Sequence, residues 1–124
     1  MQTVLLTGAT GYIGRRLERV LRNREDICLR LLVRNAKKLT AKTRSHAAVI
    51  EGDSFNDGSL RLALTGCDTA IYLIHSMGTG QDFSQLDRTS AEKFHAACLA
   101  AGVGKIIYLG GLGNRASASP HLAS

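Results

Sequence analysis

Three glycines recur at intervals of three near the start of the chain, in the segment Thr7-Gly8-Ala9-Thr10-Gly11-Tyr12-Ile13-Gly14. The apolar run Val4-Leu5-Leu6 comes directly before it. A strand that ends in a glycine-rich turn and opens a helix directs backbone N–H groups and the positive end of the helix dipole at one point, which suits a pyrophosphate. The pattern therefore predicts a dinucleotide site, and its candidate contacts are Gly8, Thr10, Gly11, Tyr12, Ile13 and Gly14.

The glycines of this segment have different expected roles. Gly8 allows the tight turn, Gly11 leaves room for phosphates near the backbone, and Gly14 lets the helix pack closely on its strand. The first gap is one residue longer than in the Gly-x-Gly-x-x-Gly fingerprint, so the surrounding elements must support the interpretation. The alternative is a glycine-rich turn that binds no ligand.

A second candidate contact, Arg34, follows the next apolar run, twenty positions after Gly14. An NAD-binding protein carries an acidic residue there for the ribose 2′-hydroxyl, whereas a guanidinium suits a 2′-phosphate through charge-assisted hydrogen bonds. Asn35 and Lys38 follow closely and are included as candidate contacts. We therefore predict that NADP(H) is favoured over NAD(H), the alternative being that Arg34 is a solvated surface residue.

Two further positions follow predicted strands. Asp53, with Ser54 next to it, is placed to accept a hydrogen bond from an adenine amino group, or alternatively to cap a turn or the next helix. Ile74 and His75 follow the most apolar strand, and the His75 imidazole is the one candidate catalytic group because it can relay a proton near the nicotinamide. The alternative is a histidine that holds its own loop.

The elements that must position these residues alternate between strand and helix along the chain. The strands are expected at 4–6, 27–33, 47–50, 70–74 and 105–109, and the main helices after Gly11, at 58–64 and at 83–101, with a short helix or turn at 36–44. Apolar strands separated by helices predict a parallel α/β sheet with right-handed crossovers. The fold class is therefore the doubly wound sheet with strand order 3-2-1-4-5.

Composition limits the function further. The 124 residues suit one domain, and no run is apolar enough to span a membrane, so a cytoplasmic protein is expected. The formal charge of +6 is concentrated after the glycines and around Arg34, without the exposed aromatics of a nucleic-acid site, so we predict no nucleic-acid partner. The charge is either a solvated helix face or an attraction for a polyanionic cofactor. Cys28, Cys67 and Cys98 are expected to be buried thiols.

The segment Tyr72-Leu73-Ile74-His75-Ser76-Met77-Gly78 resembles the "YLVHSMG" signature of a bacterial subgroup of epimerase-like proteins within the atypical and extended short-chain dehydrogenase/reductase family. Three other segments are also similar to motifs of its NmrA-like and complex-I-subunit-like NAD(P)-binding branch, namely Thr7 to Gly14, Glu51-Gly52-Asp53, and Ala101-Gly102-Val103 through Tyr108 to Leu112. The resemblance implies a Rossmann domain over residues 1–124, the N-terminal part of a longer protein, ending before the C-terminal substrate region.

The same resemblance also exposes departures from the enzymatic pattern. Working members use a Ser at the end of the fifth strand and a Tyr-x-x-x-Lys pair on the next helix. Gly110 and Gly111 stand where the Ser is expected, and the chain contains no Tyr-x-x-x-Lys segment. Two hypotheses follow: an NADP(H)-dependent oxidoreductase or epimerase acting on an unidentified small molecule, or a non-catalytic binding module that senses redox state or supports a structure. The oligomeric state is left open.

Overall fold

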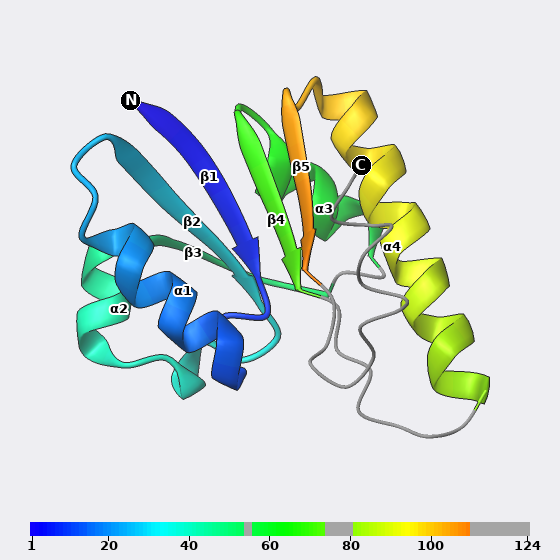
Figure 1. Cartoon of the computed structure of the whole chain (residues 1–124), viewed down its shortest axis with the longest axis horizontal. Helices are drawn as coiled ribbons and strands as arrows, with labels where there is room; N and C mark the ends of the chain where they lie inside the picture. Colours follow the sequence, from blue (N-terminus) through cyan, green and yellow to red (C-terminus); the bar gives the residue numbers. More distant parts are fainter. Residues whose placement is uncertain (54–55, 74–80, 110–124) are drawn as a thin grey trace.

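The computed structural model describes residues 1–53, 56–73 and 81–109, and of these the side chains of 81–87 are not described. Within these ranges five parallel strands form one sheet: β1 (Gln2–Thr7), β2 (Ile27–Val33), β3 (Ala48–Glu51), β4 (Thr69–Leu73) and β5 (Lys105–Leu109). Their order is β3-β2-β1-β4-β5, which confirms the predicted 3-2-1-4-5 order and the Rossmann-like α/β class (Figure 1).

Helices lie on both faces of this sheet (Figure 1). One face carries α1 (Tyr12–Arg22), the short 3-10 helix η1 (Ala36–Lys38) and α2 (Ala41–His46), while the other carries α3 (Asp57–Leu64) and α4 (Gln81–Ala101). At many of the helix and strand ends the observed boundary differs from the expected one by one or two residues. Such ends are where regular hydrogen bonding gives way to turns. Because every strand runs in the same direction, all five carboxyl ends meet at one edge of the sheet.

Alternation along the strands divides the core into two clusters, one on each face. Leu5 and Leu32 face α3 and α4, where they pack with Phe94. Leu6 and Leu31 face the other side and form a second cluster with residues of β4 and the inner surface of α1. Successive side chains of a strand point to opposite faces, so one apolar run supplies both clusters.

Not every apolar side chain of α1 packs against the sheet. Ile13, Leu17 and Leu21 do, whereas Val20 is 60% exposed.

The prediction that all three cysteines are buried is wrong for Cys28, which is exposed near the amino end of β2. Cys67 and Cys98 are buried as predicted.

Asp68 holds the amino ends of three strands together at the edge opposite the glycine turn. Its carboxylate accepts a hydrogen bond from the Thr3 N–H at 2.8 Å, and its own N–H donates to the Thr3 carbonyl at 2.9 Å. Its carbonyl accepts from the N–H groups of Gly104 and Lys105, at 3.1 and 3.2 Å. One residue therefore links β1, β4 and β5 where they begin.

Truncating Phe94 tests how strongly α4 is held on the sheet. Phe94 is fully buried and its ring centroid lies 4.7 Å from that of Tyr72. We expect Phe94→Ala to lower the free energy of unfolding by about 3–5 kcal/mol, because the truncation loses apolar burial and leaves a cavity. Denaturant unfolding measures the change. The control is Leu99→Ala on the same helix, where the side chain is 65% exposed and the loss is expected to be small.

Candidate functional site

The glycine turn joins β1 to α1 at the carboxyl edge of the sheet. Gly8 has a φ of +78°, a region that side-chain-bearing residues rarely adopt, and the Gly11 N–H donates to its carbonyl at 3.1 Å. Gly11 is the N-cap of α1 and supplies no side-chain cap, and the first turn contains no acidic residue. The first N–H groups of a helix have no partner within the helix, so this end of α1 presents donors and a positive dipole to an anion.

Gly14 determines how closely α1 approaches that turn. A Cβ atom at Gly14 would overlap the Gly8 carbonyl oxygen, and would lie 2.6 Å from the Gly8 carbonyl carbon and 2.9 Å from the Ala9 Cα. These are backbone atoms of the turn, so they cannot move aside without changing it. The third glycine is thus required by the contact between helix and turn, in the role that its spacing predicts.

Tyr12 and Ile13 are candidate contacts through their backbone atoms, because their side chains are engaged in other contacts. Tyr12 is 65% exposed and the Arg16 guanidinium lies 4.8 Å from its ring centroid. Ile13 packs against the apolar cluster beneath α1. Thr10 lies within the turn itself and is partly buried.

Arg34 is exposed immediately after β2, which has the expected bounds. The Gly52 N–H donates to the Val33 carbonyl at 2.8 Å, so Arg34 lies close to the segment that follows β3. Thr7 is paired with Leu32 in the sheet, which brings the glycine turn to the same edge. Three segments separated in the sequence therefore meet at the carboxyl ends of β1, β2 and β3.

The turn after Arg34 is held by two hydrogen bonds. Asn35 caps η1, since its side-chain oxygen accepts from the Lys37 N–H at 3.0 Å. The Ala36 N–H donates to Oε2 of Glu51 at 2.8 Å. Lys38 is exposed. The sequence analysis names Glu51 only as part of a family motif and does not predict this contact, because the strand register that places Glu51 beside η1 is set by long-range pairing.

Asp53 is partly buried two residues beyond the end of β3. Its N–H donates to Oγ of Ser59 at 3.3 Å, and its carbonyl accepts from the Asn56 N–H at 2.9 Å. The cap of α3 is Asn56, whose Oδ1 accepts from the Ser59 N–H at 2.9 Å. Asp53 therefore takes part in a turn through its backbone and does not cap the helix.

Ser54, Ile74 and His75 lie outside the described residues, as do Gly110 and Gly111. Two of the other histidines are described. Nδ1 of His46 lies 2.9 Å from the Lys42 carbonyl, and Nδ1 of His95 lies 3.0 Å from the Tyr108 hydroxyl. Burial raises the pKa of Tyr108, so its phenol stays protonated at neutral pH.

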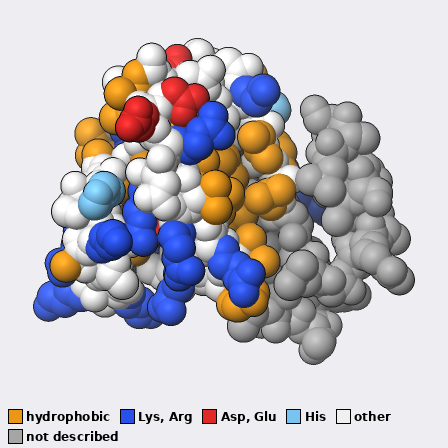
Figure 2. All heavy atoms as spheres, turned by 60° about the vertical axis from the view of Figure 1, so that its left-hand side comes forward, with side chains coloured by type: hydrophobic (Ala, Val, Ile, Leu, Met, Phe, Trp, Pro, Cys, Tyr) orange, Lys and Arg blue, Asp and Glu red, His pale blue; other side chains and the backbone are white. Residues whose placement is uncertain are grey.

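Charge is unevenly distributed over the surface. Figure 2 shows Lys and Arg side chains gathered over the lower part of one face and acidic side chains near its top. The lower part corresponds to the level at which the strand arrows end in Figure 1. The carboxyl edge therefore lies beside positive potential, which favours an anionic ligand.

The model for NAD(P)H-binding domains matches residues 8–123 of the chain. The chain belongs to this NAD(P)H-binding family. No curated protein matches it. No helix in the described part of this NAD(P)H-binding domain is long and apolar enough to cross a membrane. Residues 1–53, 56–73 and 81–109 also contain no group of three His, Cys, Asp or Glu side chains suited to a metal ion.

Solved structures with the same fold include short-chain dehydrogenase/reductase-like proteins. A nucleoside-diphosphate-sugar epimerase from Staphylococcus aureus is 27% identical with a TM-score of 0.74, over 98% of this chain and 43% of that one. A Rossmann-fold NAD(P)-binding family protein from Shigella flexneri is 26% identical with a TM-score of 0.72, over 99% and 59%. An NADPH-dependent quinone oxidoreductase from Escherichia coli, complexed with NADPH, is 26% identical with a TM-score of 0.70, over 86% and 36%.

The NAD(P)H-binding domain thus spans 59% or less of the length of each of these three proteins. Their chains contain substantial regions with no counterpart in residues 1–124. The fold is shared with these proteins. The family match over residues 8–123 includes the glycine turn and the strand ends where the candidate residues lie.

Replacing Gly14 tests the contact between α1 and the turn. We expect Gly14→Ala to destabilise the domain and to abolish dinucleotide binding, because the new methyl group overlaps the backbone of Gly8. Thermal unfolding and a dinucleotide titration measure the two effects. Gly104→Ala is the matched control, since a Cβ there would lie 3.5 Å from the Asp68 carbonyl oxygen, an ordinary contact. Equal melting temperatures for the two variants would contradict this account.

The cysteines give a test of burial that needs no ligand. Desolvation raises the pKa of Cys98 to about 12 and also raises that of Cys67, while Cys28 is exposed. Only the thiolate reacts with an alkylating reagent. At neutral pH we expect one cysteine to be alkylated in the folded chain and three after unfolding in denaturant, as counted by mass spectrometry. Rapid labelling of Cys98 in the folded chain would show that this part of the core is open.

Proposed function

We propose that the chain binds NADP(H) at the carboxyl edge of its sheet and forms the cofactor-binding part of a short-chain dehydrogenase/reductase-like oxidoreductase or epimerase. The family match supports binding of a nicotinamide dinucleotide. The finer assignment to NADP(H) depends on one observation above all, the exposed Arg34 at the end of β2, beside the glycine turn. The proposed contacts are Gly8, Thr10, Gly11, Tyr12, Ile13, Gly14, Arg34, Asn35, Lys38, Asp53, Ser54, Ile74 and His75.

Different residues are proposed to contact different parts of the cofactor. The donors at the start of α1 hold the pyrophosphate, and Arg34 and Lys38 hold the 2′-phosphate with two positive charges. Asn35 contributes by shaping the turn, since its side-chain oxygen already accepts from the Lys37 N–H. Asp53 and Ser54 are assigned to the adenine side. The bound cofactor supplies a hydride, and His75 is proposed to relay the accompanying proton.

The alternative is a non-catalytic module that binds the same cofactor. The observation in its favour is that Gly110 and Gly111 occupy the position of the Ser used by working dehydrogenases, with no Tyr-x-x-x-Lys segment in the chain. Incubation of the full-length protein with NADPH and a quinone, or with a nucleotide sugar, separates the two. Consumption of NADPH or conversion of the sugar supports an enzyme, and binding without turnover supports the module.

Calorimetric titration with NADPH and NADH tests the role of Arg34. We expect Arg34→Gln to weaken NADPH binding by roughly ten- to a hundredfold and to leave NADH binding unchanged, because charge-assisted hydrogen bonds to the 2′-phosphate are lost. Arg44→Gln is the matched control, since this exposed arginine on α2 lies ten positions beyond Arg34. Equal losses for the two cofactors in Arg34→Gln would remove the basis for the 2′-phosphate assignment.

A further inference from the structure

The outer face of the helical layer formed by α1, η1 and α2 is strongly basic. Every exposed charged side chain on these three elements is cationic, namely Arg15, Arg16, Arg19, Lys37, Lys38, Lys42 and Arg44. Their one acidic residue is Glu18, which is 4% exposed. Figure 2 shows Lys and Arg side chains gathered on the side of the molecule where Figure 1 places α1 and α2. This face therefore attracts an anionic partner.

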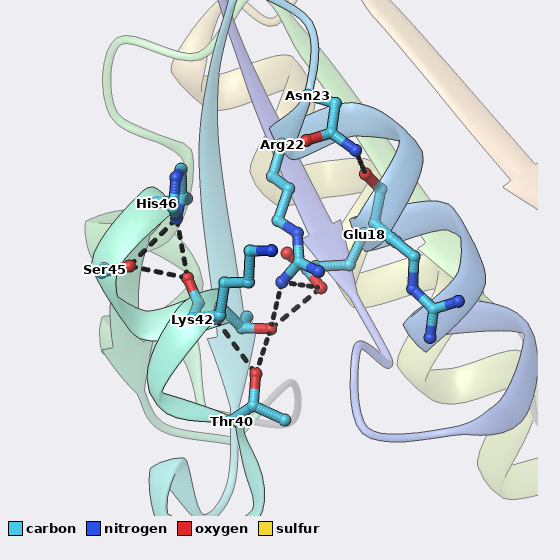
Figure 3. Close-up of polar contacts among 9 residues, drawn as sticks. Glu18, Arg22, Asn23, Thr40, Lys42, Ser45 and His46 are labelled. Atoms are coloured by element: carbon cyan, nitrogen blue, oxygen red, sulfur yellow. Dashed lines mark hydrogen bonds and ion pairs between the residues drawn. The ribbon is translucent and has the colours of Figure 1, made fainter.

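A buried network fixes the two helices of this face together (Figure 3). Thr43 Oγ1 donates to Oε1 of Glu18 at 3.0 Å and accepts from Nη1 of Arg22 at 3.1 Å. Nη1 of Arg22 also lies 3.5 Å from Oε1 of Glu18. The carboxylate is thus engaged between the helices and leaves their outer surface entirely basic. Because the network joins α1 to α2, the cations of both helices belong to one surface.

The exposed side of α1 combines arginines with apolar groups. Tyr12 and Val20 are 65% and 60% exposed, and Arg15, Arg16 and Arg19 lie between them in the sequence. Residues three and four positions apart are neighbours on a helix surface, so these five side chains form one stripe. The Arg16 guanidinium lies 4.8 Å from the Tyr12 ring centroid. Guanidinium, aromatic and aliphatic groups therefore share the same surface.

The basic surface is distinct from the proposed dinucleotide contacts. It includes Arg16 and Arg19 on α1 and Lys42 and Arg44 on α2, none of which is a proposed cofactor contact. Arg19 lies eight residues after the N-cap Gly11, about 12 Å along the helix axis. The free N–H groups of α1 point along that axis at the carboxyl edge, whereas these side chains project from the helix into solvent.

The composition of the stripe favours a membrane surface over a protein or a nucleic acid. The core of a protein interface is depleted of charged side chains, whereas here arginines separate Tyr12 from Val20. Single-stranded nucleic acids stack their bases on aromatic rings, and the Tyr12 ring already carries the Arg16 guanidinium. At a bilayer surface, guanidinium groups bind lipid phosphates while apolar neighbours enter the headgroup region.

We propose that the outer face of α1 and α2 docks on an anionic phospholipid membrane. Arg16 and Arg19 bind lipid phosphates, and Lys42 and Arg44 add to the attraction from α2. Val20 enters the headgroup region between them. The helices lie along the bilayer surface and do not cross it. No dinucleotide takes part in this contact, so the proposal does not rest on the use of NADP(H).

An introduced tryptophan identifies the face that meets the bilayer, because the chain contains none. The full chain with Val20→Trp is mixed with vesicles of phosphatidylcholine and phosphatidylserine, and its emission should shift to shorter wavelength as the indole leaves water. Vesicles of phosphatidylcholine alone should give no shift. The control is Leu62→Trp, because Leu62 is 64% exposed on α3, on the opposite face of the sheet. Equal shifts for the two variants, or none for Val20→Trp, would overturn the proposal.

Sedimentation with the same vesicles measures the contribution of the arginines. Arg16→Gln combined with Arg19→Gln should weaken binding by roughly ten- to thirtyfold, since each cation near an anionic bilayer contributes about fivefold. Added salt should also weaken binding of the unaltered chain. The matched control is Arg61→Gln combined with Arg88→Gln, which removes the same charge from exposed positions on α3 and α4. Equal losses in the two double variants would indicate diffuse attraction and overturn the proposal.

A further arm tests the other anionic partners. Sedimentation is repeated with NADPH at saturation, and separately with a single-stranded RNA oligonucleotide at a phosphate concentration equal to that of the lipid. The bound fraction should be unchanged in both. Release by NADPH would assign these cations to the dinucleotide, and release by the RNA would identify a nucleic acid as the preferred partner. Either result would overturn the membrane assignment.

Discussion

The close contact between the start of α1 and the end of β1 governs the rest of this structure. Gly8 turns the chain with a positive φ, and Gly14 lets the helix lie against the carbonyl of that same residue. The contact fixes the direction of α1, and with it the place where its first N–H groups point. It also sets the depth at which Leu17 and Leu21 meet the sheet. The end of α1 that is proposed to bind phosphate and the packing of one face therefore depend on the same two glycines.

The fold could be predicted from the sequence because its information is local and repeated. Each strand is a short, mostly apolar run, and each run is followed by a glycine or polar turn. The alternation of strand and helix therefore predicts a parallel doubly wound sheet, for which 3-2-1-4-5 is a common order. Cys28 was predicted to be buried but is exposed, because burial depends on which part of a strand is covered by a neighbouring element. A residue's hydrophobicity shows a preference for burial, whereas exposure is decided by the elements that cover it.

The candidate site could be predicted only at residues that a motif or their spacing from a strand end identifies in the sequence. Glycines at 8, 11 and 14 and the arginine at 34 can be located by spacing from a strand end. Glu51 and Glu18 could not, because one reaches η1 across a strand pairing and the other joins a network between two helices. In the sequence Glu18 lies among the arginines of α1 and resembles a surface residue. In the structure it is 4% exposed, and its Oε1 accepts a hydrogen bond from Thr43 of α2.

Asp68 has a consequence for how such a domain diverges during evolution. Its hydrogen bonds join the amino ends of β1, β4 and β5, and this is the edge of the sheet that carries no proposed ligand contact. Insertions and exchanges in the loops at the opposite edge then leave that anchorage untouched. Loop substitutions at the carboxyl edge can then change which ligand the sheet binds while the hydrogen bonds that hold the amino ends of its strands are kept.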